Sequence, residues 1–462
     1  MFNSIHKRIS YQIIALRLCF AQIDGLPFSD ILSAETIRNI MDEEVGSYRD
    51  RIYSPLITLS AFLSQVLSSD HSCRNAVAKV LAERVAQGES PCSSNTKSYC
   101  KARFRLPTSL VRRLVRETGK LLHLKSEEGW KWKGRSVKLV DGTTVSMPDT
   151  PENQKTYPQP EGQKPGVGFP IARIVAIISL SCGAVLDVAI GPYKGKETGE
   201  HALLRQILDS ISAGDIILGD RYYCSYFLIV MLQWLGADSV FRIHGSRKSD
   251  FRRGKHLGKK DHIVIWKKPK QRPNWMTESM YLQMPDTITI REIKINKKVI
   301  TTTLLDPKKF TREEIDELYT KRWLIEVDFR FIKTVLQMDI LRCKTPDMVC
   351  KEIWVNLLAY NLIRTVMAQA AHHYNLPPRT LSFKGTLQQL NAFKERFLRT
   401  AKKHLSSMYE YLLEAIVRHR VGNRHRRSEP RAVKRRRKPY PLLTKPREEA
   451  RNELWGGGGV SA

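Results

Sequence analysis

The stretch Tyr319–Lys333, YTKRWLIEVDFRFIK, decides how the rest of the chain is interpreted. At about 100° per residue, a helix places four polar side chains on one narrow face, with a fifth close by. They are Tyr319, Arg322, Glu326 and Lys333, with Arg330 beside them. Most other positions are apolar, whereas an ordinary surface helix has a broad polar face. The pattern predicts a mostly buried helix, Thr311 to Leu336, that points one acid and several cations at a single place.

A simpler interpretation of this helix stays open. Glu326 could form i,i+4 ion pairs with Arg322 or Arg330 in solvent, as many exposed helices do. The narrowness of the polar face argues against it, because the helix must be covered on most sides. We therefore favour a site for phosphates and metal.

Two aspartates follow short apolar runs that have strand character. Asp141 follows residues 137–140 and precedes Gly142, and Asp220 follows residues 216–219 and precedes Arg221. The carboxyl ends of strands form the functional crevice in open α/β sheets. An isolated aspartate of this kind is more often a turn or helix cap, so each is informative only in combination.

Three carboxylates brought together can hold two Mg²⁺ ions ~3.5–4 Å apart and clamp the attacking and leaving oxygens of a phosphoryl transfer. Asp141, Asp220 and Glu326 are the candidates for this role. Arg322 and Lys333 would neutralise neighbouring phosphates, with Arg330 as a further candidate, and Tyr319 could hydrogen-bond one. The sequence contains no P-loop or dinucleotide fingerprint that would indicate a different chemistry.

Around these residues the elements follow a mixed α/β order. Helices are expected at 33–44, 56–67, 73–85, 110–122, 201–208, 226–235, 351–372 and 387–417. Strands are expected at 136–140, 174–180, 184–190, 215–218, 239–244, 262–267, 287–295 and 297–305, and a proline-rich loop at 148–170. Ser33 is expected to cap the first of these helices. The pair 56–67 and 73–85 could form a DNA-binding helix-turn-helix, although such helical pairs are common without that role.

The net charge of +31, from 77 Lys and Arg against 46 Asp and Glu, indicates a polyanionic partner. Residues 418–447 contribute +12 and residues 242–272 contribute +10, which leaves +9 for the rest. The first window suits phosphate contacts by an unstructured tail, or a solubilising tail. The second interleaves cations with aromatic residues, as in single-strand binding, although a solvated loop between strands is equally compatible.

The compartment is expected to be the cytoplasm. The most apolar stretch, 174–186, is shorter than the ~20 residues a membrane span requires. The eight cysteines include no CxxC pair, which favours reduced thiols and no structural zinc.

With these residues in place, the chain resembles the DDE transposases of bacterial insertion sequences. Tyr319-x2-Arg322-x3-Glu326-x6-Lys333 matches the YREK signature of the insertion-sequence-four family at all four positions. The segments that begin at Asp141 and Asp220 are similar to the blocks around the first and second Asp of that family. A β-rich insertion before the glutamate is also typical of it, and the resemblance covers most of the chain.

The resemblance implies an RNase H-like mixed-sheet catalytic core, residues 126–238 and 306–375, that carries a β-rich insertion, residues 239–305. It implies an N-terminal helical and DNA-end-binding domain at 1–125, a C-terminal helical region at 376–417 and a basic, disordered tail at 418–462.

It also implies cut-and-paste transposition with Mg²⁺, or Mn²⁺ as a substitute, bound by Asp141, Asp220 and Glu326. The partners would be terminal inverted repeats and target DNA on the nucleoid. The enzyme would be at least a dimer in its synaptic complex and would cut the second strand through a hairpin. An aromatic residue of the insertion would hold a flipped base. Trp266 and Trp275 are candidates, and Trp266 could equally pack within a strand.

Two alternatives remain at this stage. One is a catalytically inactive, transposase-derived DNA-binding protein, and the other is a nuclease of the same fold that does not join ends to target DNA.

Overall fold

A computed structural model of the chain describes residues 2–23, 27–49, 51–422 and 442–456. Its centre is a nine-stranded sheet with the strand order β3-β2-β1-β4-β5-β9-β8-β7-β6. The strands of the first part are β1 (Val137–Ser146), β2 (Ile171–Ser179), β3 (Val185–Pro192), β4 (Ile216–Gly219) and β5 (Asp238–Arg242). The rest are β6 (Lys255–Gly258), β7 (Asp261–Lys267), β8 (Thr287–Ile295) and β9 (Lys298–Thr302).

The first five strands form the mixed sheet that the sequence predicts. β3, β2 and β1 are antiparallel neighbours, whereas β4 and β5 run parallel to β1. Their residues are Val-, Ile- and Leu-rich because both faces of the sheet are covered. The expectation of an RNase H-like α/β core agrees with this arrangement.

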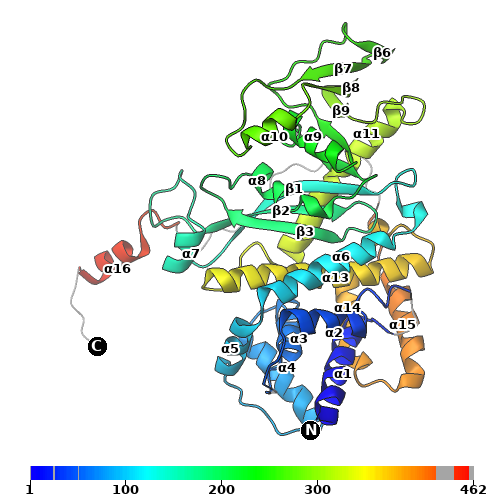
Figure 1. Ribbon diagram of the computed structural model, residues 1–462. Helices are drawn as coiled ribbons and strands as arrows, with labels where there is room; N and C mark the ends of the chain where they lie inside the picture. The colour runs from blue at the N-terminus through cyan, green and yellow to red at the C-terminus, as the bar shows by residue number, and fades with distance from the viewer. Residues whose placement is uncertain (1, 24–26, 50, 423–441, 457–462) are drawn as a thin grey trace.

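The strands of residues 255–302 continue this same sheet. β9 pairs with β5 in antiparallel orientation, and β8, β7 and β6 follow outward as a meander. β6 was not expected from the sequence, because its four residues, KHLG, carry no apolar alternation. In Figure 1 these strands project away from the helices of the opposite end.

Helices cover both faces of the sheet. On one face lie α6 (Thr108–Leu124) and α13 (Pro346–His373), and their apolar residues share a core with Leu139 and Ile178. On the other face α8 (Glu200–Arg205) and α9 (Tyr226–Trp234) share a second core with Val140 and Ile177. The alternation of neighbouring residues between two cores is the period-2 signature of a strand buried on both sides.

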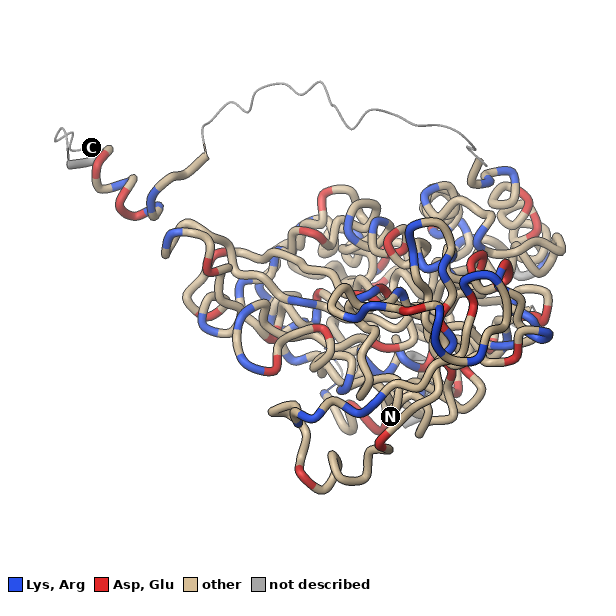
Figure 2. The backbone as a smooth tube through the Cα atoms, turned by 90° about the horizontal axis from the view of Figure 1, so that it is seen from above, with Lys and Arg blue, Asp and Glu red and all other residues tan. Residues whose placement is uncertain are grey.

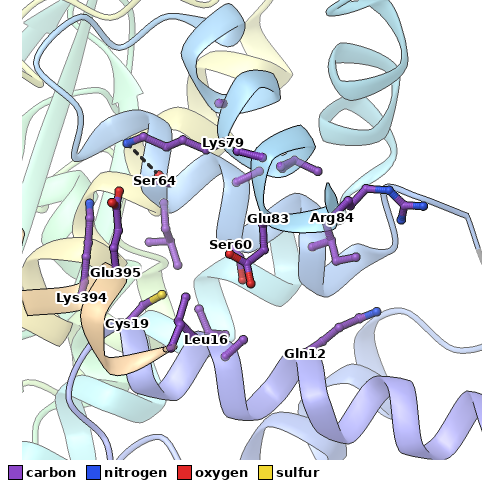
Figure 3. A pocket seen from close by; sticks show the side chains of 18 of the residues that line it. Gln12, Leu16, Cys19, Ser60, Ser64, Lys79, Glu83, Arg84, Lys394 and Glu395 are labelled. Carbon is purple, nitrogen blue, oxygen red and sulfur yellow. Dashed lines mark hydrogen bonds between the residues drawn. The ribbon is translucent and has the colours of Figure 1, made fainter. Parts of the chain in front are cut away.

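The N-terminal region is helical, as expected. It contains α1 (Phe2–Cys19), α2 (Ala34–Glu44), α3 (Pro55–Val66), α4 (Cys73–Ala86) and α5 (Lys97–Arg105), followed by the short helix η1 (Glu128–Trp130). The Ser33 side chain accepts a hydrogen bond from the Thr36 N–H, which confirms the expected cap. A cavity of about 310 Å³ opens between α1, α3, α4 and α14 (Phe383–Phe397), with Lys79 and Lys394 among its lining residues (Figure 3). No candidate catalytic residue lines it.

The long helix expected from Thr311 to Leu336 changes type three times. It consists of α11 (Arg312–Thr320), the 3₁₀ turn η3 (Lys321–Trp323), α12 (Leu324–Arg330) and the π-helical turn η4 (Phe331–Val335). A capping box between Thr311 and Glu314 begins it. Sequence periodicity cannot reveal such changes, because they depend on tertiary packing.

Four further sequence expectations are corrected. The single helix expected at 387–417 is two helices, α14 (Phe383–Phe397) and α15 (Lys402–Val417), separated by residues 398–401. The proline-rich loop contains α7 (Pro151–Thr156), and the helix expected at 201–208 is α8 followed by η2 (Leu208–Ser210). Residues 447–456 of the expected unstructured tail form α16 (Arg447–Gly456), whereas residues 423–441 and 457–462 lie outside the described residues. The remaining elements are α10 (Glu278–Gln283) and η5 (Pro378–Thr380).

Within the described ranges, no helix is long and apolar enough to span a bilayer.

Candidate active site

Asp141 lies within β1, rather than at its end as expected, because the strand continues to Ser146. The parallel pairing with β4 covers only Val137–Leu139, so Asp141 still stands just beyond the paired segment. Its Oδ1 accepts a hydrogen bond of 2.8 Å from the Gly142 N–H. Burial raises the pKa of Asp141 to about 7. The Asp220 and Glu200 carboxylates raise this pKa further, whereas the Gly142 N–H and Arg322 lower it. A carboxylate in such surroundings is poised to accept a positive partner.

Asp220 follows directly after β4, at the carboxyl end of the strand next to β1. Its Oδ1 accepts a hydrogen bond of 2.7 Å from the Tyr222 N–H, which fixes the turn. Because its charge contributes to raising the pKa of both Asp141 and Tyr319, Asp220 faces the same region as these side chains.

Arg322 connects the helix to β1. Its guanidinium donates to Glu326 Oε1 at 2.8 Å and to Asp141 Oδ2 at 3.5 Å. The ion pair with Glu326 expected under the simpler interpretation therefore exists, but it is half-buried and extends to a second carboxylate 181 positions away in the chain. The structure thus brings Asp141 and Glu326 to one guanidinium.

The other members of the polar face differ in their surroundings. Lys333 donates to Thr143 Oγ1 at 3.3 Å, and burial lowers its pKa. Tyr319 is largely buried, and burial raises its pKa while Arg322 opposes that rise. Arg330 is exposed, with its guanidinium 5.9 Å from the centre of the Phe331 ring. Arg330 is therefore more open to solvent than the other four residues of the polar face.

Asp328, a charged residue of the same helix outside its polar face, is fully buried. It pairs with Arg364 of α13 at 2.5 Å and with Arg379 of η5 at 2.7 Å. Arg379 also donates to the carbonyl oxygen of Ser179 at the end of β2. This network anchors the helix that carries Glu326 to two neighbouring elements.

The two tryptophans proposed for base stacking are already engaged. Trp266 is buried in β7, its Nε1 donates to Glu292 at 2.8 Å, and the Arg247 guanidinium lies 3.9 Å from its ring centre. Trp275 is half-buried with the Arg205 guanidinium 3.9 Å from its ring centre. The packing alternative for Trp266 fits its position. A stacking role for either ring would require its arginine to move, and it remains a prediction.

Divalent-cation binding can be judged from the chemistry of the acids. Asp141, Asp220 and Glu326 supply only carboxylate oxygens, which Mg²⁺ and Mn²⁺ prefer. Burial, with smaller contributions from the Asp220 and Glu200 carboxylates, raises the pKa of Asp141, and a bound cation would stabilise its charged form. Among the residues with described positions, however, no three of His, Cys, Asp or Glu surround one point. Arg322 lies between two of the acids, so the donor set fits a cation once this guanidinium gives way.

A fourth carboxylate, Glu200, also lies at this place, and sequence analysis did not select it. It is the first residue of α8, it accepts a hydrogen bond of 3.1 Å from the Tyr223 hydroxyl, and it contacts Gly142. No motif or periodicity marks Glu200, because only the packing of α8 over the strands brings it here.

Basic side chains surround the meander. Arg252 and Arg253 of the β5–β6 connection are exposed, as are Lys255 and Lys267. Figure 2 shows Lys and Arg positions across the whole described body, with Asp and Glu positions between them. The basic window of residues 242–272 is thus mostly surface, with Asp261 and Arg291 as a buried pair beneath it.

Comparison with known proteins places these features in a family context. A family model described as a transposase DDE domain matches residues 132–362, half of the chain, and includes all the candidate catalytic residues. The transposase InsG for insertion sequence element IS4 of Escherichia coli (strain K12) is 28% identical over 361 residues, 75% of this chain and 78% of that relative. The transposase for insertion sequence element IS421 of Escherichia coli is 33% identical over 82 residues, 18% of this chain and 21% of that relative.

Proposed function

Because the chain belongs to the DDE transposases of the insertion-sequence-four family and acts on DNA by phosphoryl transfer, we propose that Asp141, Asp220 and Glu326 are its catalytic and metal-binding residues. We further propose that the reaction is Mg²⁺-dependent, with Mn²⁺ as a substitute. It would consist of strand cleavage at the element ends followed by joining to target DNA.

The observation that carries this proposal is the bridge formed by Arg322. One guanidinium contacts Asp141 on β1 and Glu326 on α12, and Lys333 of the same helix reaches Thr143 on β1. Residues far apart in the sequence therefore converge from the sheet and the helix. Acids and cations in one half-buried place suit the charges of a phosphodiester and its counter-ions.

The chain's own residues have separable tasks in this mechanism. Asp141, Asp220 and Glu326 would hold two Mg²⁺. When bound, these ions would activate the attacking oxygen and neutralise the negative charge on the leaving oxygen. Arg322 releases the two carboxylates as it turns to a DNA phosphate, which it can engage bidentately. Lys333 places a second cation beside β1, and Tyr319 offers a phenolic hydroxyl at the same face.

The course of the reaction follows the family pattern. We propose a cut-and-paste route in which a freed 3′-hydroxyl cuts the second strand through a hairpin, within a synaptic complex of at least two subunits. The action would take place in the cytoplasm, on the nucleoid. Residues 1–125 would bind the element ends, residues 126–238 and 306–375 would catalyse, and the insertion 239–305 would track the DNA. The C-terminal part would consist of a helical region, residues 376–417, and a basic tail, residues 418–462.

The direct test uses purified full-length protein and a DNA fragment that carries the element ends. Asp141→Ala, Asp220→Ala and Glu326→Ala should still shift the DNA in a gel but lose strand cleavage in Mg²⁺. Glu317→Ala is the matched control, because Glu317 lies on the same helical segment and pairs with Lys321 at the surface.

The outcomes separate the alternatives. Normal cleavage by Glu326→Ala would show that the active-site assignment is wrong. Wild-type protein that binds the ends but does not nick them would indicate a catalytically inactive DNA-binding protein. Cleavage without any joined product would indicate a nuclease.

A further inference from the structure

The first turn of α8 touches both aspartate-bearing segments of the sheet. Glu200 and His201 are its first two residues, and neither belongs to the YREK pattern or the aspartate blocks. α8 packs on β2 and β3, and its apolar residues belong to the second core. The position of its first turn therefore depends on this core and not on the proposed catalytic residues.

Glu200 contacts the turn that follows Asp220. The Tyr223 hydroxyl donates to Glu200 Oε2 at 3.1 Å, and the Tyr223 ring is fully buried, so its hydroxyl has a fixed position. A buried hydroxyl without its acceptor carries a desolvation cost, so this contact holds the turn against α8.

Glu200 also contacts the residue that follows Asp141. A Cβ added at Gly142 would lie 2.4 Å from both Cδ and Oε1 of Glu200. Gly142 lies in extended backbone, so a side chain added there would displace the Glu200 carboxyl group and would meet no backbone restriction. The Glu200 carboxyl group is thus packed directly against the backbone of β1, next to Asp141.

His201 holds the same turn by a second contact. Its Nε2 donates to the carbonyl oxygen of Tyr222 at 2.6 Å. Its ring lies 4.8 Å from the Tyr222 ring and 5.6 Å from the Tyr223 ring, measured between centres. Because Asp220 accepts from the Tyr222 N–H, the peptide units on both sides of Tyr222 are fixed.

We propose that Glu200 and His201 are positioning residues that set the separation of Asp141 and Asp220. They act by contact with the two turns and not by binding DNA or metal. This inference rests on the proposed function, since it assumes that the two aspartates bind a divalent cation. Residues that orient the direct ligands of a metal ion typically contribute about 10–100-fold to metal affinity.

Mn²⁺ binding tests the inference without any need for catalysis. We would titrate the purified full-length protein with Mn²⁺ and follow free ion by electron paramagnetic resonance. Glu200→Ala should weaken Mn²⁺ binding roughly tenfold or more. Glu200→Gln should stay within about threefold of wild type, because its amide oxygen still accepts from Tyr223 and fills the same space. Glu161→Ala is the matched control, since Glu161 pairs with Lys194 on the surface and should bind as wild type.

A double-mutant cycle tests the contact itself. Gly142→Ala should weaken Mn²⁺ binding as much as Glu200→Ala does, because the added methyl group collides with the carboxyl group. In the double variant the collision is gone, so binding should be no weaker than in Glu200→Ala alone. If the losses of Mn²⁺ affinity in the two single variants instead multiply in the double variant, the proposed contact is contradicted. If Glu200→Ala does not fold, Tyr223→Phe removes only the hydroxyl donor and should weaken binding about threefold or more.

The results also distinguish this inference from the proposed function. If Asp141→Ala and Asp220→Ala bind Mn²⁺ as wild type does, the proposed metal site fails. If those variants lose binding while Glu200→Ala and His201→Ala retain it, only the positioning role is overturned. Equal losses in Glu200→Gln and Glu200→Ala would also overturn it, because charge and not position would then be the cause.

Discussion

At the scale of single residues, the molecule places its positive charges where negative charge is concentrated. Arg322 lies between Asp141 and Glu326, and Lys333 lies beside Thr143. The planar guanidinium can donate to two carboxylates at once, which an ammonium group does less well. The proposed metal site therefore requires that Arg322 give up these two contacts when DNA and metal bind.

Arg322→Lys should reduce strand cleavage about tenfold or more, because lysine cannot engage two oxygens in a fork. Single-turnover cleavage of an element-end fragment in Mg²⁺ would measure the rate. Arg330→Lys is the control from the same helix, and because Arg330 is exposed it should change the rate less than about threefold. A fully active Arg322→Lys would indicate that the bidentate contact has no part in the reaction.

His123 provides a pH-dependent reporter of the core. It is buried at the end of α6, hydrogen-bonded to Ser179 at 2.8 Å, and burial lowers its pKa from 6.5 to about 4. A histidine with a lowered folded-state pKa contributes stability above its unfolded pKa and loses it as pH falls toward 4. The free energy of unfolding should therefore fall by about 2 kcal/mol from this group between pH 7 and pH 5. Urea titrations at both pH values would measure it, and His123→Gln should show a smaller pH dependence than wild type.

At the scale of elements, the catalytic helix is held by contacts on the side opposite its polar face. Asp328 pairs with Arg364 and Arg379. The Arg364 guanidinium also donates to the Tyr360 hydroxyl oxygen and lies over the Phe331 and Phe383 rings. The 3₁₀ and π turns adjust the phase of the helix so that both faces meet their partners. This anchor therefore adds to the contacts that Arg322 and Lys333 of the polar face make with β1.

Asp328→Ala should destabilise the protein by about 3–5 kcal/mol, because it leaves two buried guanidinium groups without a counter-ion. Guanidinium or urea unfolding would measure the change. Glu317→Ala, which breaks a surface pair on the same helical segment, should cost less than about 1 kcal/mol. Equal effects of the two substitutions would contradict an anchoring role for the buried network.

At the scale of the whole molecule, a basic meander extends the catalytic sheet. β9 joins β5 directly, so the exposed lysines of β6 and β7 stand on the same rigid sheet as Asp141 and Asp220. DNA held by these lysines would thus have a fixed relation to the acids. The net charge of +31 would attract DNA over a long range, and the sheet fixes where the exposed lysines lie relative to the acids.

Lys255→Ala combined with Lys267→Ala should weaken DNA binding to all sequences and reduce the salt dependence of log K by up to ~2. Binding isotherms between 50 and 200 mM salt would give the slope. Lys120→Ala, an exposed lysine of α6 outside the basic window, should leave the slope unchanged. An unchanged slope in the double variant would show that the meander does not carry phosphates.

Sequence alone determined the features that repeat locally or match a family pattern. The YREK spacing, the two aspartates after apolar runs, the α/β order and the basic windows all follow from neighbours in the chain, because helical and strand periods are local properties. These features were sufficient to identify the family and to select Asp141, Asp220, Arg322 and Glu326.

The tertiary structure decided what depends on distant residues. It placed Asp141 within β1, broke the catalytic helix into four segments, buried Asp328, engaged the Trp266 ring and brought Glu200 to Gly142. Each outcome arises from packing between segments tens to hundreds of residues apart. The periodicity of a sequence reports only on neighbouring residues, so it cannot predict such contacts. The sequence thus selected the side chains that are proposed to carry the chemistry, and only the packing of helices on the sheet decided which neighbours hold them in place.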